Sequence, residues 1–149
     1  MAKLLWALPC SQVLTDRETN TVSYITCVEE MGVRELPGKF PGLFVGTHWT
    51  RTSEEDDYIR PRIRVLNPSG EEVHTRELEE RAFEDFQRYR INVQVSGFDI
   101  TEAGKYSIAV EQEENGGWVE ESRFPVWISE VASTEVSDAS EKARSGSRD

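Results

Sequence analysis

Apolar and polar residues alternate along most of this chain, with the period of β-strands rather than that of helices. The alternation is clearest in segments 87–96 and 105–112, where every second residue is apolar. The apolar positions are Tyr89, Ile91, Val93 and Val95 in the first segment and Tyr106, Ile108 and Val110 in the second. Because a strand points successive side chains to opposite faces, the pattern predicts two half-buried strands.

Further segments have the composition of strands. They are Lys3–Leu14, Thr21–Met31, Leu43–Thr50, Arg60–Leu66, Glu71–Arg76 and Trp118–Ser129. Leu43–Thr50 is partly apolar on both faces, which predicts a central strand. Pro9 predicts an edge strand or a kink, and Pro125 predicts an edge, because proline lacks a backbone donor. We therefore expect an all-β protein with one antiparallel β-sandwich of seven to nine strands over residues 1–130.

The run Asn67-Pro68-Ser69-Gly70 predicts a tight turn. Asn at the first position, Pro at the second and Gly at the fourth are typical of a type I turn. Pro68 presets its own φ angle and Gly70 tolerates a positive one, so the chain should fold straight back after the turn. We expect a hairpin between Arg60–Leu66 and Glu71–Arg76.

The segment 77–86 is ambiguous. Leu78, Ala82 and Phe86 recur at the four-residue spacing of one helix face, while the segments on either side have strand patterns. The pattern predicts either a short helix or an irregular crossing, and it leaves both open.

The stretch Thr101–Val110 lies between the two clearest strands, and its Gly104 and Tyr106 have the spacing of a tyrosine corner. Gly104 gives the backbone freedom for a change of sheet, and Tyr106 can bury its ring while its hydroxyl bonds to the backbone. The stretch resembles the Asp-x-Gly-x-Tyr run of immunoglobulin-like domains, with Glu102 in place of the aspartate. The resemblance implies an immunoglobulin-like sandwich.

A wider resemblance covers residues 3–128. It rests on a first strand of the kind Leu-Leu-x-Ala-Leu-x-Cys, a Pro/Gly-rich crossing into Leu43–Trp49, the run Ile63–Gly70 and the Ala-Gly-Lys-Tyr corner. Together these motifs resemble a family of small uncharacterised bacterial β-sandwich proteins, a domain of unknown function. The resemblance implies the fold, and it brings no function and no catalytic residue to this chain.

The chain has 149 residues and a formal net charge of -11 at pH 7. A negative field repels phosphate backbones and anionic lipids, so nucleic acid and membranes are disfavoured as partners. From Val131 onward the chain consists mainly of Ser, Ala, Thr and charged residues. Such a composition cannot bury enough apolar surface to fold, so we expect a disordered tail over residues 131–149.

The apolar runs are too short to span a membrane, and the first ten residues contain too few apolar residues for a signal peptide. These features predict a cytoplasmic protein. In that compartment Cys10 and Cys27 stay reduced, and we expect two buried thiols. A disulfide would need the two strands to be neighbours, with Cβ atoms about 3.8 Å apart.

Common catalytic and metal-binding motifs are absent from the sequence. His48 and His74 are the only histidines, and neither belongs to a zinc motif. No Gly-x-Ser-x-Gly run marks a nucleophile. We expect no catalytic residue, no metal and no cofactor. The acidic loop Glu54–Asp57 leaves two alternatives open, a calcium site completed by a neighbouring loop or a solvated loop.

Arginines are the strongest candidates for a binding surface. Arg60, Arg62 and Arg64 share one parity of a predicted strand, with Ile63 and Val65 on the other. Because unpaired buried charge is costly, we expect the three arginines on the solvent face and the two aliphatic residues in the core.

Two roles fit this arginine row. Joined by Arg88 and Arg90, it can hold a phosphate or a carboxylate-rich partner through bidentate contacts. It can instead form a ladder of ion pairs with Glu71 and Glu72 of the next strand. The sequence leaves both roles open.

These patterns predict a protein-binding or assembly module that uses loops or an exposed sheet face. The alternative is a ligand sensor or an enzyme whose site carries no recognisable motif. The protein partner is unidentified at this point, and the patterns are also compatible with a homo-oligomer.

Overall fold

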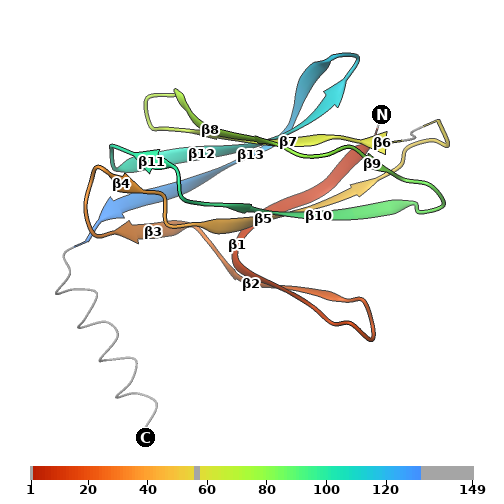
Figure 1. The fold of residues 1–149 in the computed structure, drawn as a ribbon, viewed down its shortest axis with the longest axis horizontal. Coiled ribbons are helices and arrows are strands. Elements are labelled where there is room, and N and C mark those ends of the chain that lie inside the picture. The colour runs from red at the N-terminus through yellow and green to blue at the C-terminus, as the bar shows by residue number, and fades with distance from the viewer. Residues whose placement is uncertain (1, 56–57, 132–149) are drawn as a thin grey trace, which may run out of the picture.

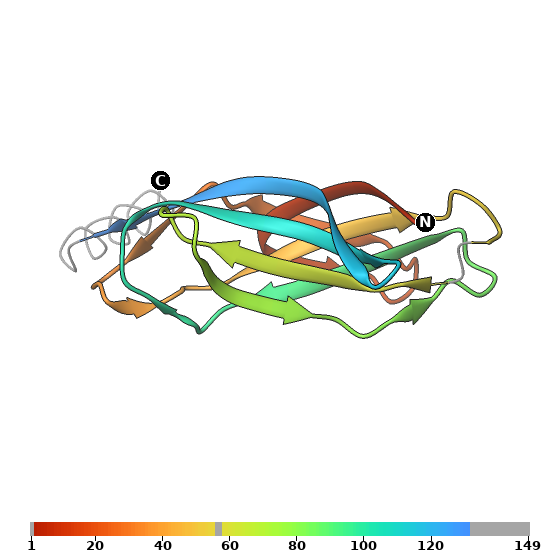
Figure 2. The same ribbon diagram turned by 90° about the horizontal axis from the view of Figure 1, so that it is seen from above.

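The computed structural model describes residues 2–55 and 58–131. Within these residues every regular element is a β-strand, so the predicted all-β class is confirmed. Figure 1 shows two layers of strands facing each other. Viewed from above, in Figure 2, the strands run roughly along the long axis of the molecule. The sandwich therefore offers two outer sheet faces and two ends where loops gather.

One layer, sheet A, has the strand order β10-β5-β1-β2 and is antiparallel throughout. Its strands are β1 (Lys3–Thr15), β2 (Val22–Cys27), β5 (Leu43–Thr50) and β10 (Arg88–Val95). β5 lies between β10 and β1, which is the central position that its two apolar faces predict.

The other layer, sheet B, has the order β3-β13-β12-β7-β8. Its strands are β3 (Glu30–Val33), β7 (Pro61–Leu66), β8 (Glu72–Glu77), β12 (Gly104–Glu114) and β13 (Gly117–Glu130). β3 pairs with β13 in parallel, whereas the other neighbours in this sheet are antiparallel. Sheet B is therefore mixed at its β3 edge, where the sequence predicted antiparallel pairing.

Two short ladders complete the described fold. β4 (Gly38–Lys39) pairs with β11 (Asp99–Ile100), and β6 (Tyr58–Ile59) pairs with β9 (Arg81–Ala82). The four strands of sheet A and the five of sheet B make nine in the two layers, which agrees with the predicted seven to nine.

The hydrophobic core lies between the two sheets, and the central strands contribute alternate residues to it. Sheet A contributes Val45, Trp49, Val93 and Val95, and sheet B contributes Ile63, Val65, Ile108, Val110, Val126 and Ile128, each at most 3% exposed. The parity read from the sequence therefore gives the buried face of these strands. The residues of opposite parity form the outer faces of the two sheets.

The predicted hairpin turn joins β7 to β8. The backbone N–H of Gly70 donates to the carbonyl of Asn67 at 2.9 Å, and Gly70 has a φ angle of 87°. β7 and β8 pair antiparallel on either side of the turn. This hairpin brings the acidic residues of β8 beside the arginines of β7.

Gly104 and Tyr106 lie where the chain enters β12. Gly104 has a φ angle of 130°, and a Cβ atom added there would lie 3.0 Å from Pro68 Cγ. The Tyr106 side chain is buried, and its hydroxyl donates to the carbonyl of Glu102 at 2.7 Å. Burial also raises the pKa of Tyr106. Tyr106 thus fixes the loop before β12 through a protected hydrogen bond.

Replacing Tyr106 by phenylalanine should remove this hydrogen bond and keep the ring packing. We expect the free energy of unfolding to fall by about 0.5 to 1.5 kcal/mol while the fold is retained. Chemical denaturation of the two proteins measures the difference. An unchanged unfolding midpoint would show that the bond to Glu102 contributes nothing to stability.

The segment 77–86 is an irregular crossing, and the alternative of a short helix is wrong. β8 ends at Glu77, and β9 supplies only two residues in this region. In the turn where the N–H of Phe86 donates to the carbonyl of Phe83 at 2.9 Å, Glu84 has a φ angle of 53°, which a right-handed helix does not allow. Phe83 is fully buried while Phe86 is 64% exposed. The helical alternative would therefore bury the wrong aromatic residue, Phe86 in place of Phe83.

The hairpin of β1 and β2 projects from sheet A, as Figure 1 shows below the two layers. β1 pairs with β5 from Lys3 to Cys10 and with β2 from Cys10 to Thr15. Most side chains beyond Cys10 are exposed or only partly buried. We call residues 11–26 the arm. It gives sheet A a concave outer side.

The predicted tail lies almost entirely outside the described residues, which end at Val131. The backbone N–H of Val131 donates to the carbonyl of Val33 at 2.8 Å, so pairing between the end of β13 and β3 extends to this residue. The predicted disorder of the tail therefore stays a prediction.

Candidate functional site

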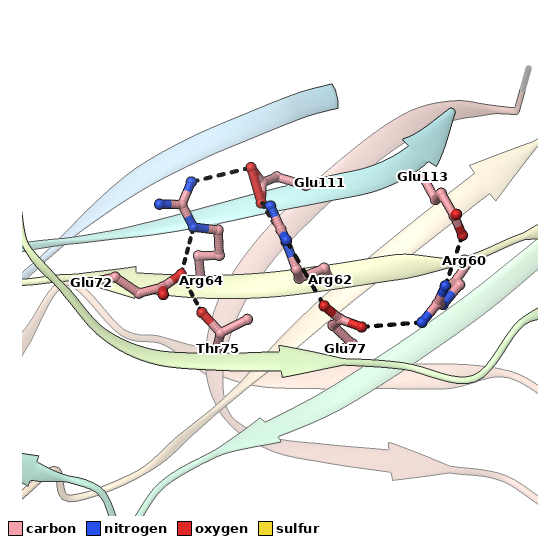
Figure 3. Close-up of polar contacts among 8 residues, drawn as sticks. All are labelled: Arg60, Arg62, Arg64, Glu72, Thr75, Glu77, Glu111 and Glu113. Atoms are coloured by element: carbon pink, nitrogen blue, oxygen red, sulfur yellow. Dashed lines mark hydrogen bonds and ion pairs between the residues drawn. The ribbon is translucent and has the colours of Figure 1, made fainter. Parts of the chain in front are cut away.

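Of the predicted row, Arg62 and Arg64 lie on the outer side of β7 and Arg60 directly precedes this strand, as Figure 3 shows. Ile63 and Val65 between them point into the core and are fully buried. The side chains of Arg60, Arg62 and Arg64 are 36%, 16% and 28% exposed. The row therefore lies on the outer face, where other side chains cover part of it.

Glu111 of β12 holds the centre of this row. One of its carboxylate oxygens lies 2.8 Å from an Arg62 nitrogen and the other lies 3.3 Å from an Arg64 nitrogen. The Glu111 side chain is only 6% exposed. A carboxylate this deeply covered interacts more strongly with its two cations than an exposed one, because less water screens it.

Glutamates on both neighbouring strands pair with the ends of the row (Figure 3). Arg60 lies 2.9 Å from Glu113 of β12 and 3.1 Å from Glu77 of β8. At the other end, Arg64 Nε donates to Glu72 at 2.8 Å. β7 therefore carries a row of cations between two rows of anions.

The aromatic ring of Trp118 covers one part of the row. The guanidinium carbon of Arg62 lies 4.2 Å from the ring centroid, and that of Arg60 lies 5.5 Å from it. Both distances are within the range of cation–π attraction. Trp118 therefore covers one face of these guanidinium groups, while the glutamates take their N–H edges.

The pKa shifts of Arg60, Arg64 and Glu72 agree with this pairing. The hydrogen bond to Glu113 raises the pKa of Arg60, and that to Glu72 raises the pKa of Arg64. The hydroxyl of Thr75, followed by Arg64, lowers the pKa of Glu72. All these groups therefore remain charged over the physiological pH range.

The structure arranges the row as a ladder of ion pairs within the protein. Of the two predicted partners, Glu72 pairs with the row, whereas Glu71 lies at the turn, where its N–H donates to Asn67 Oδ1 at 2.9 Å. Sequence reasoning missed Glu77, Glu111, Glu113 and Trp118. The glutamates stand at positions that alternate with inward-facing residues, so parity could have marked them as outward-facing. The sequence did not reveal that β12 is the neighbour of β7.

Arg88 and Arg90 do not join this row, because they belong to β10 of sheet A. The two residues share the parity opposite to the buried Val93 and Val95, so both project from the outer face. The five candidate arginines therefore form two separate surfaces, one on each sheet.

Arg88 and Arg90 line a pocket of about 420 Å³ between the arm and β10. We call it the arginine pocket. Its lining consists of Thr15, Asn20, Val22, Phe86, Arg88, Tyr89, Arg90 and Asn92. An Arg90 nitrogen donates to the carbonyl of Asn20 in the arm at 3.0 Å. Within residues 2–55 and 58–131, no carboxylate forms an ion pair with Arg88 or Arg90.

Tyr24 fixes the arm beside this pocket. Its hydroxyl donates to Asn92 Oδ1 at 2.9 Å, so the ring reaches from β2 across the sheet to β10. The ring lies directly over Gly46 of β5, where an added Cβ would be only 2.4 Å from Tyr24 Cε1. Glycine at this position therefore permits the contact that holds the arm against sheet A.

The pKa of His48 responds to the charges of the two arginines. It is the Cα partner of Arg90 in the β10-β5 ladder, and its ring packs edge-on against Trp6 with centroids 5.3 Å apart. Burial, followed by the charges of Arg88 and Arg90, lowers the pKa of His48. The neutral form of the imidazole is therefore favoured while the arginines lack a counter-ion.

Comparisons with protein-family models and with curated proteins gave no match for this chain. The resemblance to the small bacterial β-sandwich family therefore stays a prediction. In the described part of the chain there is no helix long and apolar enough to cross a membrane.

The acidic loop is only partly described, because Asp56 and Asp57 lie outside the described residues. At its start, Arg51 donates to the backbone carbonyl of Glu54 at 2.8 Å. Among the described residues, no three His, Cys, Asp or Glu side chains come together as metal ligands. The choice between a calcium site and a solvated loop stays open.

The two cysteines differ in exposure. Cys10 is fully buried and Cys27 is exposed, and both are free thiols. The expectation of two buried thiols is therefore wrong for Cys27. It lies at the end of β2, where the arm begins to leave the sandwich, and the interior ends there.

Proposed function

We propose that the protein is a cytoplasmic binding module whose arginine pocket takes up an acidic segment of a partner protein. The observation that carries the proposal is that two adjacent guanidinium groups lack a carboxylate partner in the described structure, although the chain has a net charge of -11. A chain with so many carboxylates can readily pair its own arginines, as the row on β7 does. Two arginines left without one at a concave site favour an external anion.

The spacing of Arg88 and Arg90 suits an extended peptide. Two residues along a strand are about 7 Å apart, and alternate side chains of an extended ligand have the same separation. The exposed ring of Phe86 lies in the same pocket. The proposed ligand therefore carries two acidic side chains at alternate positions and an apolar side chain beside them.

The ladder on β7 is a weaker candidate for the partner surface. Its three arginines already contact four glutamates and Trp118. A ligand would have to displace these contacts before it could form its own. The ladder accordingly contributes to stability in this proposal, and the arginine pocket contributes recognition.

A ligand sensor for a small anion is the second candidate. The pocket volume of about 420 Å³ is within the usual range of small-molecule sites. The same two arginines would bind a free carboxylate or phosphate. A preference for an acidic peptide over a small anion distinguishes the binding module from the sensor.

Likeness to the immunoglobulin-like bacterial sandwich family is part of the proposal. The buried Tyr106 with its bond to Glu102 and the turn at Asn67 support it, because both belong to motifs that carry the resemblance. Loops and arms on such a rigid sandwich are a common place for recognition.

Selection from a random peptide library, followed by titration of the best peptide, tests the function. We expect enrichment of Asp and Glu at alternate positions next to an apolar residue, and binding that weakens as salt is added. The double variant Arg88→Gln, Arg90→Gln should lose at least about tenfold in affinity, since two charged hydrogen bonds disappear. Arg34→Gln, Arg81→Gln is the matched control, because it removes the same charge outside the pocket.

The NMR titration of His48 gives a second reading. The positive field of the arginines contributes to the low pKa of His48, so a bound acidic peptide or the Arg88→Gln, Arg90→Gln change should raise this pKa. Selected peptides without acidic residues, or equal affinity of the pocket variant and the control, would contradict the proposal. Equal binding of inorganic phosphate and the peptide would favour the small-anion sensor.

A further inference from the structure

Cys10 and Cys27 face each other across β1 and β2, where they are Cα partners. One position nearer the sandwich, the N–H of Val28 donates to the carbonyl of Pro9 at 3.0 Å. Hydrogen-bonded and non-hydrogen-bonded pairs alternate along an antiparallel ladder, so the two cysteines occupy a non-hydrogen-bonded pair. At such pairs the Cα atoms are about 4.5 Å apart, which is within the range that a disulfide needs.

The two thiols differ in access. A hollow of about 430 Å³ opens onto Cys27, with Phe124, Pro125 and Trp127 of β13 in its wall. Cys10, its partner across the ladder, is fully buried. A reagent from solvent therefore reaches Cys27 first, and Cys10 can respond only through its neighbour across the ladder.

We propose that Cys10 and Cys27 are a reversible dithiol–disulfide pair that peroxide oxidises through Cys27. This inference is independent of the arginine pocket and of the function proposed for it. It adds a modification site at the root of the arm.

The reaction has two balanced steps. The Cys27 thiolate attacks one oxygen of the peroxide, so an S–O bond forms, the O–O bond breaks, and the departing hydroxide takes a proton to become water. Cys10 sulfur then attacks Cys27 sulfur, so the S–S bond forms while the S–O bond breaks, and the hydroxide leaves with the Cys10 proton as a second water. The two thiols lose two electrons in total, and the peroxide gains them.

A small neutral oxidant fits this hollow better than a charged one. Glu29 and Glu30 lie in its lining, and their carboxylates repel anionic disulfides such as oxidised glutathione. Cytoplasmic thiol reductants can return the pair to the reduced state over longer times. Oxidation at this position would tie β1 to β2 where the arm begins.

Peptide mapping of the full chain tests the pair. The reduced protein is treated with hydrogen peroxide, blocked with an alkylating reagent and cleaved after Lys and Arg without reduction. Arg17 separates the two cysteines, so the expected product is a peptide 4–17 joined to a peptide 18–34. Free thiols should fall from two per chain to none, and a reductant should restore both.

Two single variants separate the roles of the thiols. Cys10→Ala should accumulate a sulfenic acid at Cys27 that a dione reagent traps, whereas Cys27→Ser should leave Cys10 unmodified under the same treatment. If Cys10→Ala does not fold, the map of the native chain still decides the question. Thiols that stay free while added free cysteine is oxidised, or a product that links Cys27 of two molecules, would overturn the inference.

Discussion

Replacing Glu111 by glutamine is expected to lower the free energy of unfolding by about 2 to 3 kcal/mol. The carboxylate is almost fully covered and contacts both Arg62 and Arg64. Without the charge of Glu111, two partly buried guanidinium groups are still shielded from water but lose the ion pair that offsets this desolvation. The value lies below that for a completely buried pair because Arg64 retains Glu72 as a partner. Chemical denaturation of the variant beside the parent protein measures it.

Glu77→Gln is the matched control on the same ladder. Glu77 also contacts the arginine row, but its side chain is 47% exposed and water can replace what is lost. We expect a change below about 1 kcal/mol, as for other exposed ion pairs. A similar small change for Glu111→Gln would show that Arg62 and Arg64 remain hydrated without it.

A compensated variant separates charge pairing from packing. Arg62→Met, Arg64→Met and Glu111→Leu together remove the buried charges and fill much of their volume with apolar atoms. Such replacements of buried ion networks are often neutral or stabilising. We therefore expect the triple variant to be more stable than Glu111→Gln. A lower stability would show that these ion pairs contribute more than their desolvation costs.

The ladder on β7 shows which features of the fold local sequence patterns can predict. Period-2 alternation placed Ile63 and Val65 in the core and the arginines outside, because the two faces of a strand differ so much in burial cost. The turn at Asn67 gave the pairing of β7 with β8, since its residues preset the backbone. Both features are fixed by residues close together in the sequence.

Contacts between distant strands were outside the reach of the same patterns. Glu111 pairs with Arg62 only because β12 lies beside β7, and many strand orders satisfy the same alternation. For the same reason, parity placed Arg88 on an outer face without showing which sheet it belongs to. The parallel pairing of β3 with β13 also depends on sheet order, which a single sequence leaves open.

To predict the arginine pocket, the sequence would also have had to reveal the arm. The strand segments of β1 and β2 were expected, but the projection of their hairpin beyond sheet A depends on β1 leaving β5 at Cys10. Asn20 reaches Arg90 only because of that projection. Exposed Leu14 and Ile25 have the same apolar alternation as a core strand, so the sequence pattern does not reveal that the arm is solvated.

The crossing between β8 and β10 leads to the second prediction, a loss of about 3 kcal/mol in the free energy of unfolding on replacement of Phe83 by alanine. Phe83 is fully buried, and its ring packs edge-on against Tyr89 with centroids 6.4 Å apart. The Arg51 guanidinium lies 5.7 Å from the ring centroid on another side. Removing the ring leaves a cavity beside Tyr89 and Arg51, which can collapse only in part.

Phe86→Ala is the matched control, since the helical alternative would bury Phe86 rather than Phe83. Phe86 is 64% exposed, so its loss should change stability by no more than about 0.5 kcal/mol. Thermal or chemical unfolding of the two variants ranks them directly. A helix that buries Leu78 and Ala82 also buries Phe86 and exposes Phe83. Equal losses for the two variants, or a larger loss for Phe86→Ala, would therefore contradict the irregular crossing and support the helix.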